Sequence, residues 1–356
     1  MRLYSLVVQT FRNIEGAELL PDPELTVIAG KNGQGKTNLL ESIWLLTGGK
    51  SFRGSRDYDL VKKGDLFSKI EGFAQAEQKE NRLGITVAGM DSGKRGRYAK
   101  VNGVDFGRAS NIAGVFTAVV FDPNHLNLVK GGPDGRRRFL DAALCQLYPG
   151  YISVLRRYRR SLNQKNALLK KHREIPDGQN MLDAFDEELV LSGGEMTKRR
   201  KAYLGMAAPA AEEAYDQLTA GTEVWKVNYI SCCPEGELAS LLKQSRRADI
   251  RAGFSTIGPH REDFETLING EKAKVFGSQG QQRSAVLSLK IAEGAAAQKV
   301  TGEHPVMLLD DVLSELDETR QAYLLSRIQG KQTFVTSCDA GAFGRTAGRI
   351  IKVEQG

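Results

Sequence analysis

Near the N-terminus, the alternation of apolar and polar residues predicts a strand, a tight loop and a helix. Residues 25–29 read LTVIA, a short apolar run of β-prone residues. Residues 38–46, NLLESIWLL, have the composition of a helix, and GKNGQGKT at 30–37 separates the two segments. Short apolar runs bounded by glycine are typical of buried strands. We therefore expect a strand that leads through a glycine-rich loop into a helix.

The spacing of apolar positions changes along the middle of the chain. Residues 64–122 hold β-prone segments broken by glycine, such as 83–87 and 98–101. Residues 125–250 are mostly helical by composition, and a rough helical stripe runs through 151–169. This stripe consists of Tyr151, Leu155, Tyr158, Leu162 and Leu169. β-like sequence returns at 254–276, so a helical region is expected to interrupt a β-containing one.

Composition restricts the class of protein. The 356 residues are 41% hydrophobic and 26% charged, which is typical of a globular chain of more than one small domain. No stretch approaches the ~18–20 apolar residues of a membrane-spanning helix, and MRLYSLVVQTFRN lacks the pattern of a signal peptide. The four cysteines show neither metal-ligand spacing nor a disulfide framework. We expect a cytoplasmic protein.

The positive charge is concentrated in one segment. Residues 130–173 hold 12 Lys and Arg against 2 Asp and Glu, a net +10, whereas the whole chain carries +7. A basic block of this strength favours a polyanionic partner, most often nucleic acid. A solvated helix face would give the same pattern, and the composition alone leaves both interpretations open.

The glycine-rich loop matches the phosphate-binding pattern G-x-x-x-x-G-K-[ST]. Its glycines allow the backbone to curl so that successive N–H groups point at phosphates, and the following helix N-terminus adds partial positive charge. Lys36 can reach the β- and γ-phosphates of ATP, and the Thr37 hydroxyl can bind Mg²⁺. The predicted ATP-binding residues of the loop are Gly30, Lys31, Asn32, Gly33, Gln34, Gly35, Lys36, Thr37 and Asn38.

A second nucleotide-site element lies far along the chain. Residues 306–311 read VMLLDD, an apolar strand that ends in two acids, as in the Walker B pattern. Asp310 would hold Mg²⁺, and Asp311 would orient the attacking water, which makes Lys36, Asp310 and Asp311 the predicted catalytic residues. ATP-binding-cassette (ABC) enzymes usually have Glu at the second position. Because Asp311 is one methylene shorter, we expect slow hydrolysis.

Two segments compete for the role of the ABC signature loop, which contacts the ATP held by a second subunit. LSGGE at 191–195 has the familiar letters, but Ser192 lies 118 residues before Asp310. Ser278 of GSQGQQR lies only 32 residues before it, enough for one helix, a short loop and the strand. Spacing therefore favours the later segment, with the signature residues Ser278, Gln279, Gly280 and Gln281. SELD at 314–317 would then be the D-loop, with Ser314 and Asp317 near the partner subunit.

The LSGGE segment needs another explanation. Ser192 followed three residues later by Glu195 fits the S-x-x-E capping box, in which a side chain at each position satisfies a backbone N–H at a helix start. We therefore expect a helix to begin at Ser192.

With these motifs placed, the chain resembles the RecF family of bacterial DNA-repair ATPases, relatives of the SMC heads, nearly from end to end. The matching stretches are TFRNI at 10–14, GKNGQGKTN at 30–38, Pro133 with RRRFLD at 136–141, GPHRED at 258–263, GSQGQQR at 277–283 and LLDDVLSELD at 308–317. The resemblance implies that Arg12 and Asn13 approach the nucleotide. LSGG is not a family feature.

The resemblance implies an α/β fold with an ABC-type P-loop ATPase head of mixed β-sheets and helices, and an inserted, mainly α-helical lobe II. The P-loop and Walker B strand must meet in space, so we expect a discontinuous head of residues 1–124 and 253–356. Residues 125–252 would form the DNA-binding and dimerisation arm.

The function implied by the resemblance is ATP-gated DNA binding in recombinational repair. ATP and Mg²⁺ would drive homodimerisation around DNA, RecO- and RecR-like proteins would be partners, and RecA loading the outcome. The predicted DNA-binding residues are Arg136, Arg137, Arg156, Arg157, Arg160, Lys170 and Lys171.

Two other functions account for some of the motifs. The ATPase subunit of a membrane transporter would share them, but such subunits carry a switch histidine where FVTS at 334–337 offers Thr336. A P-loop protein with a merely solvated basic helix is the third possibility.

Overall fold

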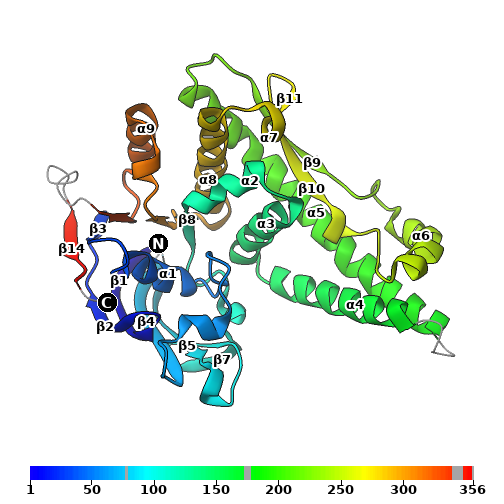
Figure 1. Ribbon diagram of the computed structural model, residues 1–356, viewed down its shortest axis with the longest axis horizontal. Helices are drawn as coiled ribbons and strands as arrows, with labels where there is room; N and C mark the ends of the chain where they lie inside the picture. Colours follow the sequence, from blue (N-terminus) through cyan, green and yellow to red (C-terminus); the bar gives the residue numbers. More distant parts are fainter. Residues whose placement is uncertain (77–78, 172–177, 339–347, 355–356) are drawn as a thin grey trace. The chain divides into compact units, whose positions relative to one another are not determined.

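The chain divides into two compact units (Figure 1). The computed structural model describes residues 1–76, 79–171, 178–338 and 348–354. Unit 1 combines Met1–His125 with Val286–Gly356, and unit 2 is Leu126–Ala285. The second boundary lies later than the expected 252. Residues 263–272 remain in unit 2 because strands β10 (Asp263–Ile268) and β11 (Glu271–Lys272) form a sheet with β9 (Trp225–Ile230).

Unit 1 contains a five-stranded parallel sheet in the order β14-β3-β13-β12-β8. The strands are β3 (Leu25–Ala29), β8 (Ala118–Phe121), β12 (Val306–Leu309), β13 (Thr333–Ser337) and β14 (Arg349–Lys352). Strands β3, β8 and β12 are buried along their whole length, which explains why they read as unbroken apolar runs. The strands predicted from LTVIA and VMLL are both confirmed.

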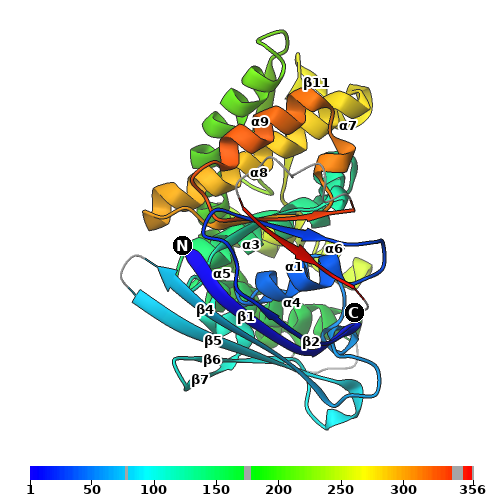
Figure 2. The same cartoon turned by 90° about the vertical axis from the view of Figure 1, so that its left-hand side faces the viewer.

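A six-stranded antiparallel sheet, β2-β1-β4-β5-β6-β7, accompanies the parallel sheet in unit 1 (Figure 2). Its strands are β1 (Arg2–Phe11), β2 (Ile14–Leu19), β4 (Phe67–Ala76), β5 (Lys79–Ala88), β6 (Arg97–Val101) and β7 (Val104–Arg108). Helix α1 (Lys36–Leu45) contributes to one apolar cluster with both sheets, for example through Leu40 with Leu6 and Leu308. The core of unit 1 thus fixes the helix that follows the P-loop.

Unit 2 is mainly helical, as predicted. It contains α2 (Asn127–Lys130), α3 (Pro133–Leu147), α4 (Tyr151–Lys171), α5 (Gly178–Leu218), α6 (Leu238–Ala252), η6 (Pro259–Arg261) and α7 (Ala273–Phe276). Four predicted stripe residues of α4 are buried, and Leu162 is half-buried. Strand β9 was not predicted from the sequence. Helix α8 (Gln279–Thr301) begins in unit 2 and continues into unit 1, and α9 (Glu318–Ile328) belongs to unit 1.

The prediction that a helix begins at Ser192 is wrong. Ser192 lies inside the 41-residue helix α5, is fully buried, and its hydroxyl donates to the Glu188 carbonyl at 2.5 Å. Glu195 instead pairs with Arg199 one turn later, at 2.6 Å. A Cβ added to Gly193 would lie 3.1–3.3 Å from side-chain atoms of three other elements of unit 2. The glycine therefore permits close packing, and a helix interior offers no unpaired backbone N–H groups to a phosphate.

Candidate nucleotide-binding site

The P-loop joins β3 to α1 in the conformation that its glycines allow. Gly33 and Gly35 have φ of 83° and 103°, a region that side chains other than glycine rarely occupy. A Cβ on Gly30 would come within 2.6 Å of the Val353 carbonyl oxygen. Lys36 is 7% exposed and donates to the carbonyls of Gly30 at 2.5 Å and Lys31 at 3.1 Å. The loop thus carries a cation held against its own backbone.

The Walker B acid meets the P-loop threonine as predicted. The Thr37 hydroxyl donates to Asp310 Oδ1 at 2.8 Å, and the Thr336 hydroxyl donates to the same oxygen at 3.0 Å. Burial raises the pKa of the Asp310 carboxyl, while the two hydroxyl hydrogen bonds oppose this rise. A buried carboxylate beside a threonine hydroxyl is a suitable oxygen-ligand set for Mg²⁺, which usually takes one or two carboxylates plus phosphate oxygens. The residues present therefore fit the expected ion.

Among the described residues, no group of three or more His, Cys, Asp or Glu side chains could hold a metal ion.

Asp122 is a second acid at the same edge of the sheet, and sequence reasoning missed its role. Leu309 of β12 is paired with Phe121 of β8, and the Asp310 amide donates to the Phe121 carbonyl at 2.9 Å. Asp122 therefore follows its strand at the level of Asp310, and its charge helps to raise the pKa of the Asp310 carboxyl. The signal was available: AVVF before Asp122 repeats the pattern of VMLL before Asp310.

A polar chain connects the predicted Asn13 to the start of α1. The Asn38 side-chain amide donates to Asn13 Oδ1 at 2.5 Å, and Asn13 Nδ2 donates to the Gly33 carbonyl at 3.3 Å. The exposed Arg53 donates to Asn38 Oδ1 at 2.9 Å. Arg53 also lowers the pKa of Asp310, although burial raises it more. Arg53 is thus a cation of this site that no sequence motif indicated.

Arg12 contacts the helix that follows the P-loop. Its Nε and Nη2 donate to the two oxygens of the buried Glu41 at 2.5 and 3.0 Å, and Nη2 also donates to the Ser55 hydroxyl at 2.7 Å. These contacts attach Arg12 to α1 rather than to the P-loop backbone. Arg12 therefore fixes the helix behind the phosphate site.

The residues after Asp310 are held by local hydrogen bonds. The Asp311 amide donates to the Thr336 hydroxyl at 2.8 Å, and Asp311 has φ of 50°, unusual for a residue other than glycine. The Ser314 hydroxyl donates to the Asp311 carbonyl at 2.7 Å. Asp317 accepts from the Arg320 amide at 3.0 Å and is the N-cap of α9, and this backbone hydrogen bond lowers the pKa of its carboxyl.

The signature segment forms the capping box that was predicted for LSGGE. The Ser278 amide donates to Gln281 Oε1 at 2.7 Å, and the Gln281 amide donates to Ser278 Oγ at 3.2 Å. Ser278 thereby precedes the first turn of α8, and both Ser278 and Gln279 are exposed. Gln281 and Gly280 are half-buried.

Two of the predicted DNA-binding arginines are paired with other residues of unit 2. Arg136 is 8% exposed and forms a two-pronged ion pair with Asp263, at 2.6 and 2.7 Å. Arg137 donates to the Glu262 carbonyl at 2.7 Å and is paired with Asp134. Arg136 is therefore occupied by the half-buried carboxylate of Asp263 and is not available to phosphate. In contrast, Arg156, Arg157, Arg160, Lys170 and Lys171 are all exposed.

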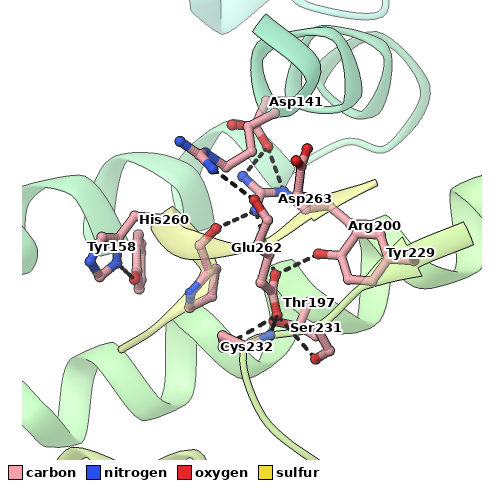
Figure 3. A network of polar contacts seen from close by, with 12 residues as sticks. Asp141, Tyr158, Thr197, Arg200, Tyr229, Ser231, Cys232, His260, Glu262 and Asp263 are labelled. Carbon is pink, nitrogen blue, oxygen red and sulfur yellow. Dashed lines mark hydrogen bonds and ion pairs between the residues drawn. The ribbon is translucent and has the colours of Figure 1, made fainter. Parts of the chain in front are cut away.

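Glu262 is the centre of a polar network that holds unit 2 together (Figure 3). Its carboxylate accepts hydrogen bonds from Tyr229 at 2.5 Å and Thr197 at 2.8 Å, and lies 3.6 Å from Arg200. Arg200 also donates to Asp141 at 2.9–3.0 Å. The network joins α3, α5, β9 and the start of β10, and it turns acidic side chains inward.

Lys165 is a further base of this segment that is buried in unit 2. Lys165 on α4 is 1% exposed and contacts Asp186 at 2.8 Å and Asp249 at 3.2 Å. The predicted basic block therefore divides into internal bases and an exposed set. Arg173 of that block lies outside the described residues.

The fold and the site define a P-loop ATPase head of the type found in SMC proteins. Residues 2–355 match the family described as RecF/RecN/SMC N terminal domain. An SMC head domain from Pyrococcus furiosus has the same fold at a TM-score of 0.52, with 15% identity over 95% of this chain and 89% of that one. No helix within the described residues is long and apolar enough to cross a membrane.

The chain belongs to the RecF family. It is 36% identical to the DNA replication and repair protein RecF of Halalkalibacterium halodurans, over 100% of this chain and 98% of the relative. It is 38% identical to RecF of Bacillus cereus (strain B4264), over 95% and 92% of the two chains. A solved structure described as the recombination mediator protein RecF-ATP in the RecFOR pathway superposes with a TM-score of 0.91 at 33% identity, over 99% and 96%.

Proposed function

We propose that this protein is an ATP-dependent DNA-binding protein that acts in recombinational repair and replication-fork maintenance. ATP would bind at the P-loop and drive two chains together, each placing Ser278 on its partner's ATP. The observation that carries the proposal is the contact of Thr37 with Asp310 beside a buried Lys36, in a chain related to an ATP-bound RecF. These three residues supply the parts that phosphoryl-transfer sites require.

The residues of unit 1 have separate tasks in the proposed hydrolysis. Thr37 and Asp310 would hold Mg²⁺, which neutralises charge on the phosphates when it is bound. Lys36 would bind phosphate oxygens in place of its present backbone carbonyls. Asp311, exposed at the end of β12, would orient water. Its short side chain supports slow hydrolysis, suited to release of a clamp rather than to rapid turnover.

The DNA-binding surface is proposed to lie on α4 and α6. Helix α4 contains no acidic residue, and the only acid of α6, Asp249, is fully buried. The exposed bases of α6 follow a four-residue spacing that places them on one face: Lys243, Arg247 and Arg251. Thus α4 has no acid, α6 buries its single acid, and most bases of both helices are exposed, which supports binding to phosphates rather than chance solvation.

The two helices approach each other near the end of α4. Ile250 of α6 packs against the cluster that Leu168 and Leu169 of α4 form with Leu182, and a Cβ on Gly253 would lie 3.6 Å from Lys170. Their bases can therefore act on one stretch of DNA backbone, and each phosphate contact should steepen the salt dependence of binding.

The RecFOR relatives support a place for this chain beside RecO- and RecR-like proteins, upstream of RecA loading.

One experiment tests the central proposal. The dimer fraction is measured by sedimentation, and DNA affinity by fluorescence anisotropy, each with and without ATP and Mg²⁺. Both quantities should rise with ATP in the natural chain and fail to rise in Lys36→Ala. If neither depends on ATP, the clamp mechanism is wrong.

The DNA surface is tested separately by charge removal. Arg156, Arg157 and Arg160 are replaced by Gln, and in a second variant Lys243, Arg247 and Arg251. Each lost phosphate contact should reduce the slope of log affinity against log salt by roughly 0.9. The matched control replaces three exposed bases of unit 1, Lys69, Arg82 and Lys100, and changes net charge equally. Equal loss of affinity in all three variants would mean that only net charge matters.

A further inference from the structure

Glu223 joins the signature segment to the long helix of unit 2. The residue lies between α5 and β9. Its Oε1 accepts a hydrogen bond from the Gln281 side-chain amide at 2.8 Å, and its Oε2 accepts one from the Tyr215 hydroxyl at 2.6 Å. One carboxylate thus connects a signature residue with the end of α5.

Both ends of the Gln281 side-chain amide are held, one by Glu223 and one by Ser278. Gln281 Oε1 accepts from the Ser278 amide, and its Nε2 donates to Glu223. If either partner were lost, the amide group could rotate and the capping box would loosen. A hydrogen bond to an ionised carboxylate is about twice as strong as a neutral one, so the Glu223 contact contributes much of this restraint.

The other side of the bridge is rigid. Tyr215 is fully buried, and its ring stacks on the buried Trp225 with centroids 5.2 Å apart and an interplanar angle of 19°. The carboxylate is therefore anchored to packed aromatic rings at the junction of α5 and β9, rather than to a flexible loop.

The capping arrangement leaves Ser278 able to act on a ligand. Its Oγ accepts from the Gln281 amide, and a hydroxyl has one donor as well as two acceptor positions. The hydrogen bond from the Gln281 amide thus sets the orientation of the exposed Ser278 hydroxyl, and Glu223 holds the Gln281 side chain in turn.

We infer that Glu223 is a positioning residue for the signature loop: through Gln281 it holds Ser278 ready for the γ-phosphate on a second copy of this chain, and it links that loop to α5. The inference rests on the proposed role of Ser278 in ATP-driven dimerisation. Movement of α5 when DNA binds to unit 2 would reach the signature loop through Tyr215 and Glu223.

The test compares Glu223→Ala with Glu223→Gln. The alanine variant should weaken ATP-driven dimerisation about tenfold, the loss expected for a removed charge-assisted hydrogen bond. The glutamine variant should stay within about threefold of the natural chain, because its carbonyl can accept from Gln281 while its amide donates to Tyr215. Binding of ATP to the monomer should be unchanged in both. The matched control is Glu213→Ala, which removes an exposed carboxylate of α5. Among the described residues, this carboxylate has a hydrogen bond only with Gln217.

Amide hydrogen exchange provides a readout that does not depend on dimerisation. Without nucleotide, Glu223→Ala should speed exchange at residues 278–283 and leave the middle of α5 unchanged. If the natural chain fails to dimerise with ATP, the proposed function falls, but the exchange result still decides whether Glu223 positions the loop. Exchange and dimerisation equal to those of Glu213→Ala would overturn the inference, as would a glutamine variant as impaired as the alanine variant.

Discussion

Residues 191–195 and 278–281 carry nearly the same local pattern, a serine followed three residues later by Glu or Gln, yet they differ completely in structure. Ser192 is buried in the middle of α5 and donates to a backbone carbonyl, whereas Ser278 is exposed at the start of α8 and accepts from a backbone amide. A capping box stabilises a helix start only if the preceding residues leave the helical conformation. Residues 178–191 are helical, so the box cannot form at Ser192.

The largest expected difference between the two segments concerns dimerisation. Ser278→Arg places a long side chain at the proposed contact with the partner's ATP and should weaken ATP-driven dimerisation at least 100-fold, in sedimentation experiments with ATP and Mg²⁺. Ser192→Ala should leave it unchanged. Alanine is the right control because the site of Ser192 is fully buried and would not accept a larger side chain. Thermal unfolding confirms that both variants fold, and loss of dimerisation in Ser192→Ala alone would reverse the assignment.

Two arginine-rich stretches also differ in burial although they look alike in sequence. The buried Arg136 on α3 is paired with the half-buried Asp263, whereas Arg160 on α4 is exposed. Arg136→Ala would leave Asp263 without its cation and should lower the free energy of unfolding by about 3–5 kcal/mol. Arg160→Ala should change it by less than about 0.5 kcal/mol. Denaturant unfolding measures both, and equal effects would mean that the Arg136 pair is not a structural element.

The parts of the molecule that could be predicted from sequence are those whose conformation depends on residues close to them in the chain. The P-loop, its flanking strand and helix, and the Walker B strand each depend on neighbouring residues, because a glycine-rich turn or an unbroken apolar run determines its own conformation. All of them lie where the sequence pattern predicted them, and Thr37 meets Asp310.

The features that sequence did not reveal depend on partners far along the chain. Lys165 falls on the apolar stripe of α4, but only the fold shows that Asp186 and Asp249 neutralise it. Gln281 likewise matches a motif, while its contact with Glu223 joins residues 58 positions apart. Charge counts alone cannot separate internal from exposed bases, because pairing is a property of tertiary structure.

Within LSGGE itself, one glycine should not tolerate a large side chain. Gly193 faces Tyr158, Leu238 and Pro259, and a Cβ added to it would lie 3.1–3.3 Å from their side-chain atoms. Gly193→Leu would force these elements apart and should lower the free energy of unfolding by about 1–3 kcal/mol. Thermal and denaturant unfolding of the whole chain measure the effect. A neutral result would show that the packing around α5 is loose.

The adjacent Gly194 provides the smallest and opposite effect. It lies in the same helix, is exposed, and a Cβ would meet no atom within 4 Å. Gly194→Ala should therefore raise the free energy of unfolding by about 0.5–1 kcal/mol, because alanine restricts the unfolded chain and favours the helix. Had residues 191–195 been a nucleotide-contacting loop, the same change would impair ATP-driven dimerisation. Greater stability with unchanged dimerisation is thus the outcome that only a helix interior explains.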